Sequence, residues 1–208
     1  MKVSFIGDSI RIQYTPFVKK LLGDGYEFFE PKENCRFAKY TLRGIFDWEK
    51  DMRGSRIVHW NNGLWDVCDL FGDGLFSSES EYVGNMLRIA DILKSRYETV
   101  IFATTTPVSP LNKYNSNDDI RRYNELIVPL LSERGIVIND LYSLIASDVG
   151  KYVSDDLIHL NDAGIDICAA QVAKVIDREA KNLSPVASSV ATPVENRDSG
   201  APVIYIEE

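Results

Sequence analysis

The stretch KVSFIGDS, residues 2–9, decides the prediction of the fold. A short run of apolar and β-forming residues (2–6) meets Gly7, and a segment with apolar residues at helical spacing begins at Ile10. A buried strand, a glycine-containing turn and a helix, in this order, are typical of the first βα unit of a parallel sheet. The stretch therefore places Ser9 where a strand gives way to the N-terminus of a helix.

The same alternation continues along the chain. Four more short apolar runs predict strands, at 26–29, 56–60, 99–103 and 136–138. Segments with helical periodicity separate and follow them, at 10–22, 41–53, 80–97, 117–133 and 162–182. This order predicts a three-layer α/β/α sandwich around a mostly parallel five-stranded sheet. In such sheets ligands bind beyond the carboxyl ends of the strands, and Ser9, Asn61 and Thr104 follow predicted strands.

Composition divides the chain into two parts. Residues 1–183 have the length and apolar content of one ordinary domain. Residues 184–208 are rich in Ser, Pro, Ala and Val, which is typical of a linker or loosely packed extension. The final VIYIEE, residues 203–208, can add a strand or contact a neighbouring chain. The sequence does not predict an oligomeric state.

Charge, cysteine content and the absence of known signals indicate which partners and which cell compartment to expect. The net charge is −8 with scattered Lys and Arg, which argues against a nucleic-acid partner. Three cysteines without a CxxC pair indicate buried thiols in a reducing compartment, and no cluster predicts a metal. No signal peptide, long apolar span or nucleotide-binding motif is evident. We expect a cytoplasmic protein that does not insert into membranes and needs no cofactor.

Two motifs can supply a nucleophile and its base. Ser9, within Gly7-Asp8-Ser9, precedes a helix whose free N–H groups suit a developing oxyanion; the plain alternative is a helix cap. His159 follows Asp156 by three residues, so one turn can bring a base and its carboxylate together; the plain alternative is a surface loop. The other histidine, His59, lies in an apolar strand and is interpreted as a core residue.

A third motif, HWNNGLWD (residues 59–66), enters a loop after a predicted strand. A side-chain amide at that position can donate a hydrogen bond to an oxyanion, an interaction worth about 3 kcal/mol in the transition state. The plain alternative is that Asn-Asn-Gly serves only as turn chemistry.

Taken together in this order, the three motifs resemble the SGNH/GDSL hydrolase family over residues 3 to about 180. The resemblance implies a flavodoxin-like SGNH fold, with Ser9 as nucleophile and oxyanion donor. It implies that His159 acts as general base and then general acid, oriented by Asp156. WNNGLWD is similar to a variant third block, N-x-G-L-[HW]-D, which assigns the oxyanion amide to Asn61 and leaves Asn62 in reserve.

The second block departs from the family pattern. The family has a Gly whose N–H completes the oxyanion hole, often in N-x4-G-x-T, whereas residues 34–41 read NCRFAKYT. Lys39 falls where the Gly is expected, and any residue except Pro can supply the N–H. Gly44 is a second candidate with poorer spacing. Further residues are expected to line the substrate pocket: Asp8, Asn62, Trp60, Trp65 and Thr104.

The resulting expectation is a serine esterase that hydrolyses short acyl esters, such as acetyl esters, of a saccharide or another small polar alcohol. Polar loops at 31–40 and 110–119 suit a sugar, and Trp60 and Trp65 can stack on a ring or pack an acyl chain. Alternatives are a lysophospholipase or thioesterase, an acyltransferase with the same site, and a non-catalytic saccharide-binding module.

Overall fold

A computed structural model describes residues 1–184 of the chain, and its centre is a five-stranded sheet. The strands are β1 (Lys2–Ile6), β2 (Glu27–Phe29), β3 (Ser55–Trp60), β4 (Thr99–Ala103) and β5 (Val137–Asn139). Their order is β2-β1-β3-β4-β5, and every neighbouring pair is parallel. The predicted parallel five-stranded sheet is therefore confirmed.

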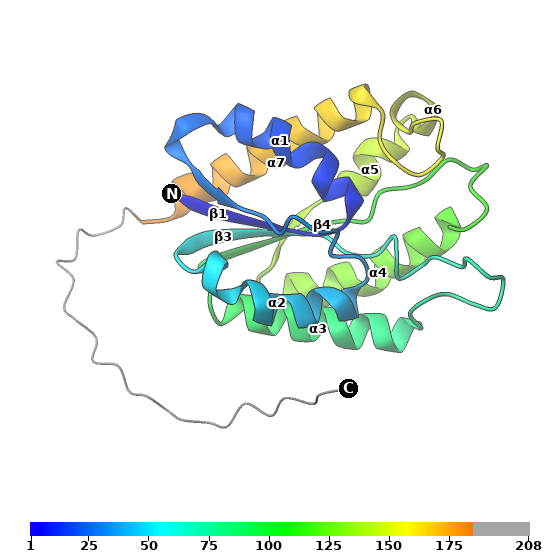
Figure 1. The fold of residues 1–208 in the computed structure, drawn as a ribbon, viewed down its shortest axis with the longest axis horizontal. Coiled ribbons are helices and arrows are strands. Elements are labelled where there is room, and N and C mark those ends of the chain that lie inside the picture. Colours follow the sequence, from blue (N-terminus) through cyan, green and yellow to red (C-terminus); the bar gives the residue numbers. More distant parts are fainter. Residues whose placement is uncertain (185–208) are drawn as a thin grey trace.

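Helices cover both faces of this sheet (Figure 1). Helices α1 and α7 lie side by side on one face, and α2, α3 and α4 cover the other. The long helices are α1 (Ser9–Leu22), α2 (Ala38–Met52), α3 (Glu79–Lys94), α4 (Asn117–Glu133) and α7 (Asp162–Asn182). Together with the sheet they form the predicted three-layer sandwich.

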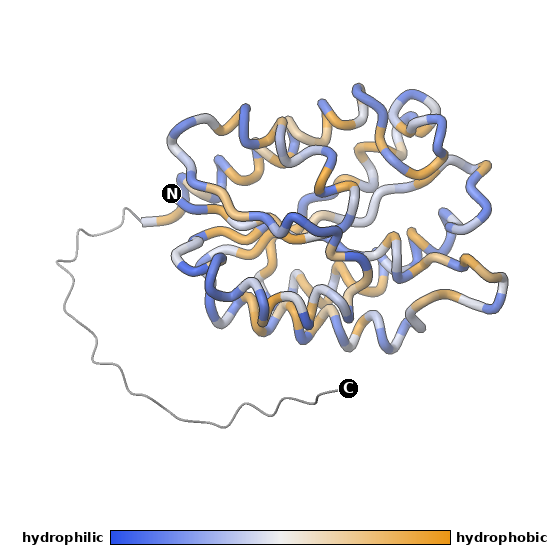
Figure 2. Tube along the Cα trace, in the orientation of Figure 1, coloured by the Kyte–Doolittle hydropathy of each residue, from blue (hydrophilic) through white to orange (hydrophobic). Residues whose placement is uncertain are grey.

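Burial on both faces explains why the central strands are largely apolar. All five residues of β4 are buried, as are the last four of β1. Figure 2 shows apolar residues along these central strands, while the helices alternate between apolar and polar residues. The core therefore occupies the two interfaces between the sheet and its helical layers.

The helix predicted at 41–53 begins earlier, at Ala38, so the predicted loop 31–40 is too long. The Ala38 N–H, the first of the helix, is bound by the carboxylate of Asp66, which lies far along the chain. A cap supplied from such a distance leaves no local signal in the sequence.

Three short elements were not predicted: the 3-10 turn η1 (Gly23–Gly25), α5 (Leu141–Ala146) and α6 (Val149–Tyr152). Each of the two short helices is opened by an aspartate, Asp140 and Asp148 respectively, whose side chain accepts a backbone N–H. They lead the chain from β5 toward the DxxH segment.

The C-terminal extension and its possible terminal strand, residues 203–208, lie outside the described residues. Within residues 1–184, no helix combines the length and apolarity that crossing a membrane requires.

Candidate active site

The turn between β1 and α1 presents Ser9 as the first residue of the helix. Asp8 caps that helix, since its Oδ1 accepts the Ile10 N–H at 3.0 Å. Gly7 has a φ of +156°, and a Cβ there would lie 1.8 Å from Oδ1 of Asn61. The turn thus depends on glycine, because the Asn61 carboxamide packs directly against its backbone.

Ser9, His159 and Asp156 form one hydrogen-bonded chain. The Ser9 Oγ lies 2.8 Å from Nε2 of His159, and Nδ1 of the same ring lies 2.7 Å from Oδ2 of Asp156. Ser9 and His159 are 150 residues apart in sequence, and the fold brings them together at the carboxyl end of the sheet. This is the geometry in which a histidine can take the serine proton while a carboxylate fixes its ring.

The DxxH turn holds its aspartate through several hydrogen bonds. Oδ1 of Asp156 accepts from the backbone N–H groups of Ile158 and His159 and from the Ser154 hydroxyl. Burial acts to raise the pKa of Asp156, but these donors and the His159 ring together hold that pKa well below its usual range. Leu157, inside the turn, has a φ of +72°, a conformation that costs a residue with a side chain roughly 1 kcal/mol or more.

Gln13 fixes this turn to α1, the helix that begins at Ser9. Its Nε2 donates to the Leu160 carbonyl at 3.0 Å, and its Oε1 accepts the Leu160 N–H at 3.1 Å. Gln13 lies one helical turn after Ser9, and Leu160 follows His159 directly. One side chain therefore sets the position of the histidine relative to the serine, and no sequence motif predicted this role for Gln13.

The two asparagines of the third block have different surroundings. Nδ2 of Asn61 donates to Oδ1 of Asp8 at 2.8 Å, which places the Asn61 carboxamide beside the nucleophile turn. Asn62 is fully buried, with Oδ1 accepting from the Trp60 indole and Nδ2 donating to the Arg36 carbonyl. Each amide group keeps one hydrogen without a partner in the part of the chain that the structure describes, but the Asn61 amide is the one bound to Asp8 in the turn that carries Ser9, whereas Trp60 and Arg36 hold both ends of Asn62.

The second block is held against both of the others. The Cys35 N–H donates to the Gly7 carbonyl at 3.0 Å, so this segment runs beside the nucleophile turn. Lys39 lies in the first turn of α2, and within the described part of the chain no hydrogen bond engages its N–H. Gly44 lies inside α2 against the Trp48 ring, where helix N–H groups bond the preceding turn. Of these two candidates, Lys39 therefore has a backbone N–H without a hydrogen-bond partner among the described residues, and Gly44 does not.

Asp66 is the residue that fixes the start of α2. Its carboxylate accepts the Ala38 N–H at 3.0 and 3.2 Å and the Ser77 hydroxyl at 2.7 Å. Burial raises its pKa to about 7, although these hydrogen bonds act in the opposite direction. The last letter of NNGLWD was the available signal for this residue, and the sequence analysis gave it no role.

A small pocket opens beside the hydrogen-bonded chain, with a volume of about 280 Å³. Its walls are mainly apolar, and the following residues line it: Ser9, Leu64, Trp65, Cys68, Leu70, Asn112, Tyr114, Asn115, Asp156, Ile158 and His159. Trp65 lies in this wall as expected. Asn112, Tyr114 and Asn115 belong to the polar stretch 110–119 that was expected to meet a sugar, whereas Cys68 and Leu70 follow the NNGLWD motif and carry no signal of their own.

Four of the residues expected in the pocket lie elsewhere, and one of them is Asn62, which is fully buried. Trp60 is fully buried and packs edge-on against Phe102 in the core. Thr104 bonds Asp140 and the Tyr142 N–H, so it joins β4 to α5. Asp8 is buried beneath the nucleophile turn, and burial raises its pKa. Each lies at or just after the carboxyl end of a strand, but its side chain is buried.

The remaining titratable candidates belong to the interior. His59 is fully buried against Phe5 and Tyr14, and burial lowers its pKa to about 3. The three cysteines are buried free thiols. Among residues 1–184, no group of three or more His, Cys, Asp and Glu side chains could hold a metal ion.

Comparisons with known proteins give structural matches only. No family model and no curated protein sequence matches the chain. A GDSL-like lipase from Bacteroides thetaiotaomicron has a TM-score of 0.67 and 20% identity, over 86% of this chain and 88% of that one. An acetylxylan esterase from Geobacillus stearothermophilus, solved as a catalytic mutant, has a TM-score of 0.71 and 16% identity, over 84% and 93%. A carbohydrate esterase family 3 protein from Talaromyces cellulolyticus has a TM-score of 0.66 and 20% identity, over 88% and 100%. The chain therefore has the fold of the SGNH/GDSL hydrolases.

Proposed function

We propose that the protein is a serine ester hydrolase with Ser9 as nucleophile, His159 as general base and Asp156 as the carboxylate that orients it. One observation carries the proposal: the continuous contact from the Ser9 hydroxyl through the His159 ring to Asp156, at 2.8 and 2.7 Å. A helix cap needs no histidine, and a surface histidine needs no serine, so neither plain alternative explains this chain of contacts.

In the acylation half of the reaction, His159 takes the Ser9 proton as Oγ attacks the ester carbonyl carbon. The carbonyl electrons move onto oxygen and form a tetrahedral oxyanion. The intermediate collapses when the C–O bond to the alcohol breaks, and His159 returns the proton to the departing alkoxide. Asp156 keeps the ring in the tautomer that accepts at Nε2 and stabilises the imidazolium.

We assign three donors to the oxyanion. Ser9 is the first residue of α1, so its N–H has no acceptor within the helix. The Asn61 amide has one hydrogen left after its bond to Asp8, and the Lys39 N–H is free at the start of α2. Each such donor contributes about 3 to 4 kcal/mol to the transition state.

In the deacylation half, water takes the place of the alcohol. His159 removes a proton from the water as it attacks the acyl carbon, the same donors hold the second oxyanion, and Ser9 leaves with the proton from His159. Every proton transfer runs through His159, so the chemistry needs no cofactor from outside the chain.

We propose a short acyl group, such as acetyl, on a saccharide or another small polar alcohol. Two proteins with the same fold are described as an acetylxylan esterase and a carbohydrate esterase, which supports this substrate class. The pocket beside Ser9 is small, at about 280 Å³, and its apolar wall suits an acyl group.

A lipophilic ester is the second candidate, as for a lysophospholipase or thioesterase. Its support is the apolar wall of the pocket and the exposed apolar side chains near its mouth, Leu70 and Tyr114, which are 41% and 52% exposed. A longer acyl chain gains about 0.8 kcal/mol for every buried CH₂, so chain-length dependence separates the two candidates.

The test is hydrolysis of p-nitrophenyl esters of increasing acyl length by the wild type and Ser9→Ala. We expect Ser9→Ala to abolish turnover while the circular dichroism spectrum stays native. Ser78→Ala is the matched control, because Ser78 caps α3 and lies outside the pocket that contains Ser9; it should cost about 1 kcal/mol of stability and keep its activity. A Ser9→Ala protein that turns over esters at the wild-type rate would remove the nucleophile from the proposal.

Hydrolysis and acyl transfer use the same acyl-enzyme, and analysis of products formed with and without an acceptor sugar distinguishes them. A non-catalytic saccharide-binding module would leave every ester intact in this screen.

A further inference from the structure

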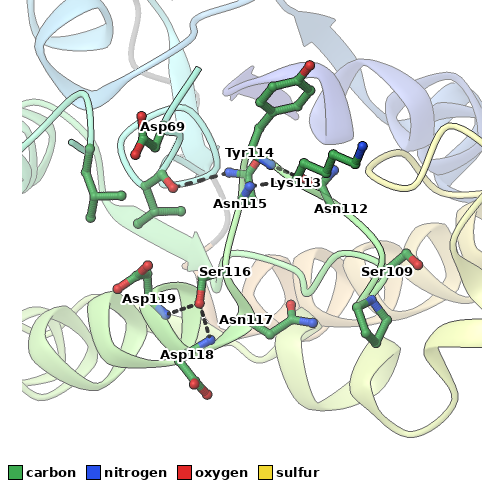
Figure 3. Close-up of a pocket in the computed structure, with 13 residues that line it drawn as sticks. Asp69, Ser109, Asn112, Lys113, Tyr114, Asn115, Ser116, Asn117, Asp118 and Asp119 are labelled. Atoms are coloured by element: carbon green, nitrogen blue, oxygen red, sulfur yellow. Dashed lines mark hydrogen bonds between the residues drawn. The ribbon is translucent and has the colours of Figure 1, made fainter. Parts of the chain in front are cut away.

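A second cavity, of about 500 Å³, lies next to the pocket that contains Ser9. Its lining comes from the loop around Asp69 and from the segment that runs from Ser109 into the first turn of α4. Figure 3 shows Asp69 and Asp119 on one side of the segment that carries Tyr114 and Ser116. Nothing in the proposed ester chemistry uses Asp69 or Asp119.

The two cavities share a wall. Asn112, Tyr114 and Asn115 line both the pocket beside Ser9 and the second cavity. Asn115 is 6% exposed, and its Nδ2 donates to the Leu64 carbonyl at 2.7 Å, which ties this wall to the loop that follows Asn61. A ligand with two parts can therefore occupy both cavities across this short segment.

The chemistry of the two cavities differs. The pocket beside Ser9 has mainly apolar walls, whereas the second cavity is lined mainly by carboxylate, amide, hydroxyl and ammonium side chains. Among the described residues, no side-chain hydrogen bond engages Asp119 or Lys113, so both have free bonding capacity. Tyr114 is half exposed and stands at the shared wall, where its ring can cover the apolar face of a sugar.

We infer that the second cavity binds the alcohol part of the ester, a neutral saccharide, while the pocket beside Ser9 takes the acyl group. Sugar hydroxyls donate to carboxylates and accept from ammonium groups, and Asp69, Asp119 and Lys113 supply both kinds of partner. The inference rests on the proposed esterase function and specifies which part of the molecule selects the substrate.

Two esters of one acid test this division. O-acetylated xylooligosaccharide and p-nitrophenyl acetate form the same acetyl-enzyme but differ in the alcohol. The measurement is the ratio of their kcat/KM values in the wild type, Asp69→Asn and Asp119→Asn. We expect each substitution to lower the saccharide-to-nitrophenyl ratio by about 10-fold or more, the effect of losing one hydrogen bond to a charged group. Asp73→Asn is the matched control, because Asp73 is exposed in the same loop as Asp69 and lies outside the cavity.

The outcomes separate the inference from the function on which it depends. A ratio that stays within about twofold of wild type in both variants would overturn the saccharide subsite. A second result would also overturn it: Ser9-dependent hydrolysis of acetylcholine with a KM that rises in Asp69→Asn. That result would show that the cavity binds a cation instead of a neutral saccharide. Failure of the proposed function looks different: neither ester would be turned over in a Ser9-dependent way.

Discussion

Replacing Gly7 with alanine tests the arrangement of the nucleophile turn most directly. The added Cβ would lie 1.8 Å from Oδ1 of Asn61 and 2.8 Å from its Cγ, and contacts shorter than 3.0 Å are essentially never seen. The carboxamide must therefore move by more than an ångström, which breaks its 2.8 Å bond to Asp8. The φ of +156° adds strain, because alanine rarely adopts it.

The expected magnitudes follow from these contacts. A strained residue costs about 1 to 3 kcal/mol, and the lost hydrogen bond adds about 1 kcal/mol, so we expect Gly7→Ala to lose roughly 2 to 4 kcal/mol of folding free energy. Displacing the Asn61 amide removes one oxyanion donor, which lowers kcat by about 100- to 1,000-fold with little change in KM. Urea denaturation and steady-state hydrolysis of p-nitrophenyl acetate measure the two effects.

Gly84→Ala is the control for this experiment. Gly84 lies within α3, and an added Cβ would meet no atom within 4 Å. Alanine there should stabilise the helix by roughly 0.5 to 1 kcal/mol and leave kcat unchanged. A Gly7→Ala protein with wild-type stability and kcat would refute the placement of the Asn61 carboxamide against the turn.

Four further outcomes are expected. Asn61→Ala should lower kcat by about 100-fold or more with a small loss of stability. Asn62→Ala, which leaves the buried Trp60 indole N–H and the Arg36 carbonyl without their partner, should lose roughly 2 kcal/mol or more of unfolding free energy, and equal effects of the two variants would reject the distinction. Asp156→Asn should reduce kcat by about 10,000-fold with the fold intact, because the ring loses its orienting acceptor, and a loss of less than tenfold contradicts this role. Asp66→Ala should lower both kcat and melting temperature, because the first N–H of α2 loses its acceptor. Asp66→Asn can still accept that N–H and should recover most of kcat. Equal losses of kcat in the two variants would mean that the hydrogen bond to α2 does not support activity. Burial lowers the pKa of His59 to about 3, so as pH falls below about 6.5 the unfolded chain binds a proton at this residue and the folded chain does not. Between about pH 7.5 and 5 the free energy of unfolding of the wild type should therefore fall by about 2 kcal/mol relative to that of His59→Gln. Parallel plots of unfolding free energy against pH for the two proteins would exclude this effect.

The fold could be predicted because its strands are buried on both faces. Continuous apolar runs at 2–6 and 99–103, separated by helical periodicity, leave few alternatives to a parallel sheet covered on both sides. The same property misled the prediction for Trp60: in a strand with two buried faces, a side chain at the carboxyl end can point into the core as easily as toward the ligand.

The candidate site was predictable where a motif is local and unpredictable where a contact is long-range. The order of GDS, NNGLWD and DxxH indicated Ser9, Asn61 and His159, and the structure brings these residues to one end of the sheet. The Asp66 cap spans 28 residues, and its partner, a backbone N–H, carries no sequence signal. The positive φ of Leu157 is equally hidden, since nothing in a leucine indicates a left-handed conformation.

The amide of Gln13 has a consequence for how the site tolerates change. Ser9 and Gln13 belong to one rigid helix, and Gln13 holds the backbone directly after His159 by two hydrogen bonds. Leu160 lies two residues before α7 begins, so the same two bonds join α1 to the start of α7 and oppose a displacement that would separate Ser9 from His159. We expect substitutions between these two helices to leave the Ser9–His159 distance short as long as both Gln13 bonds remain.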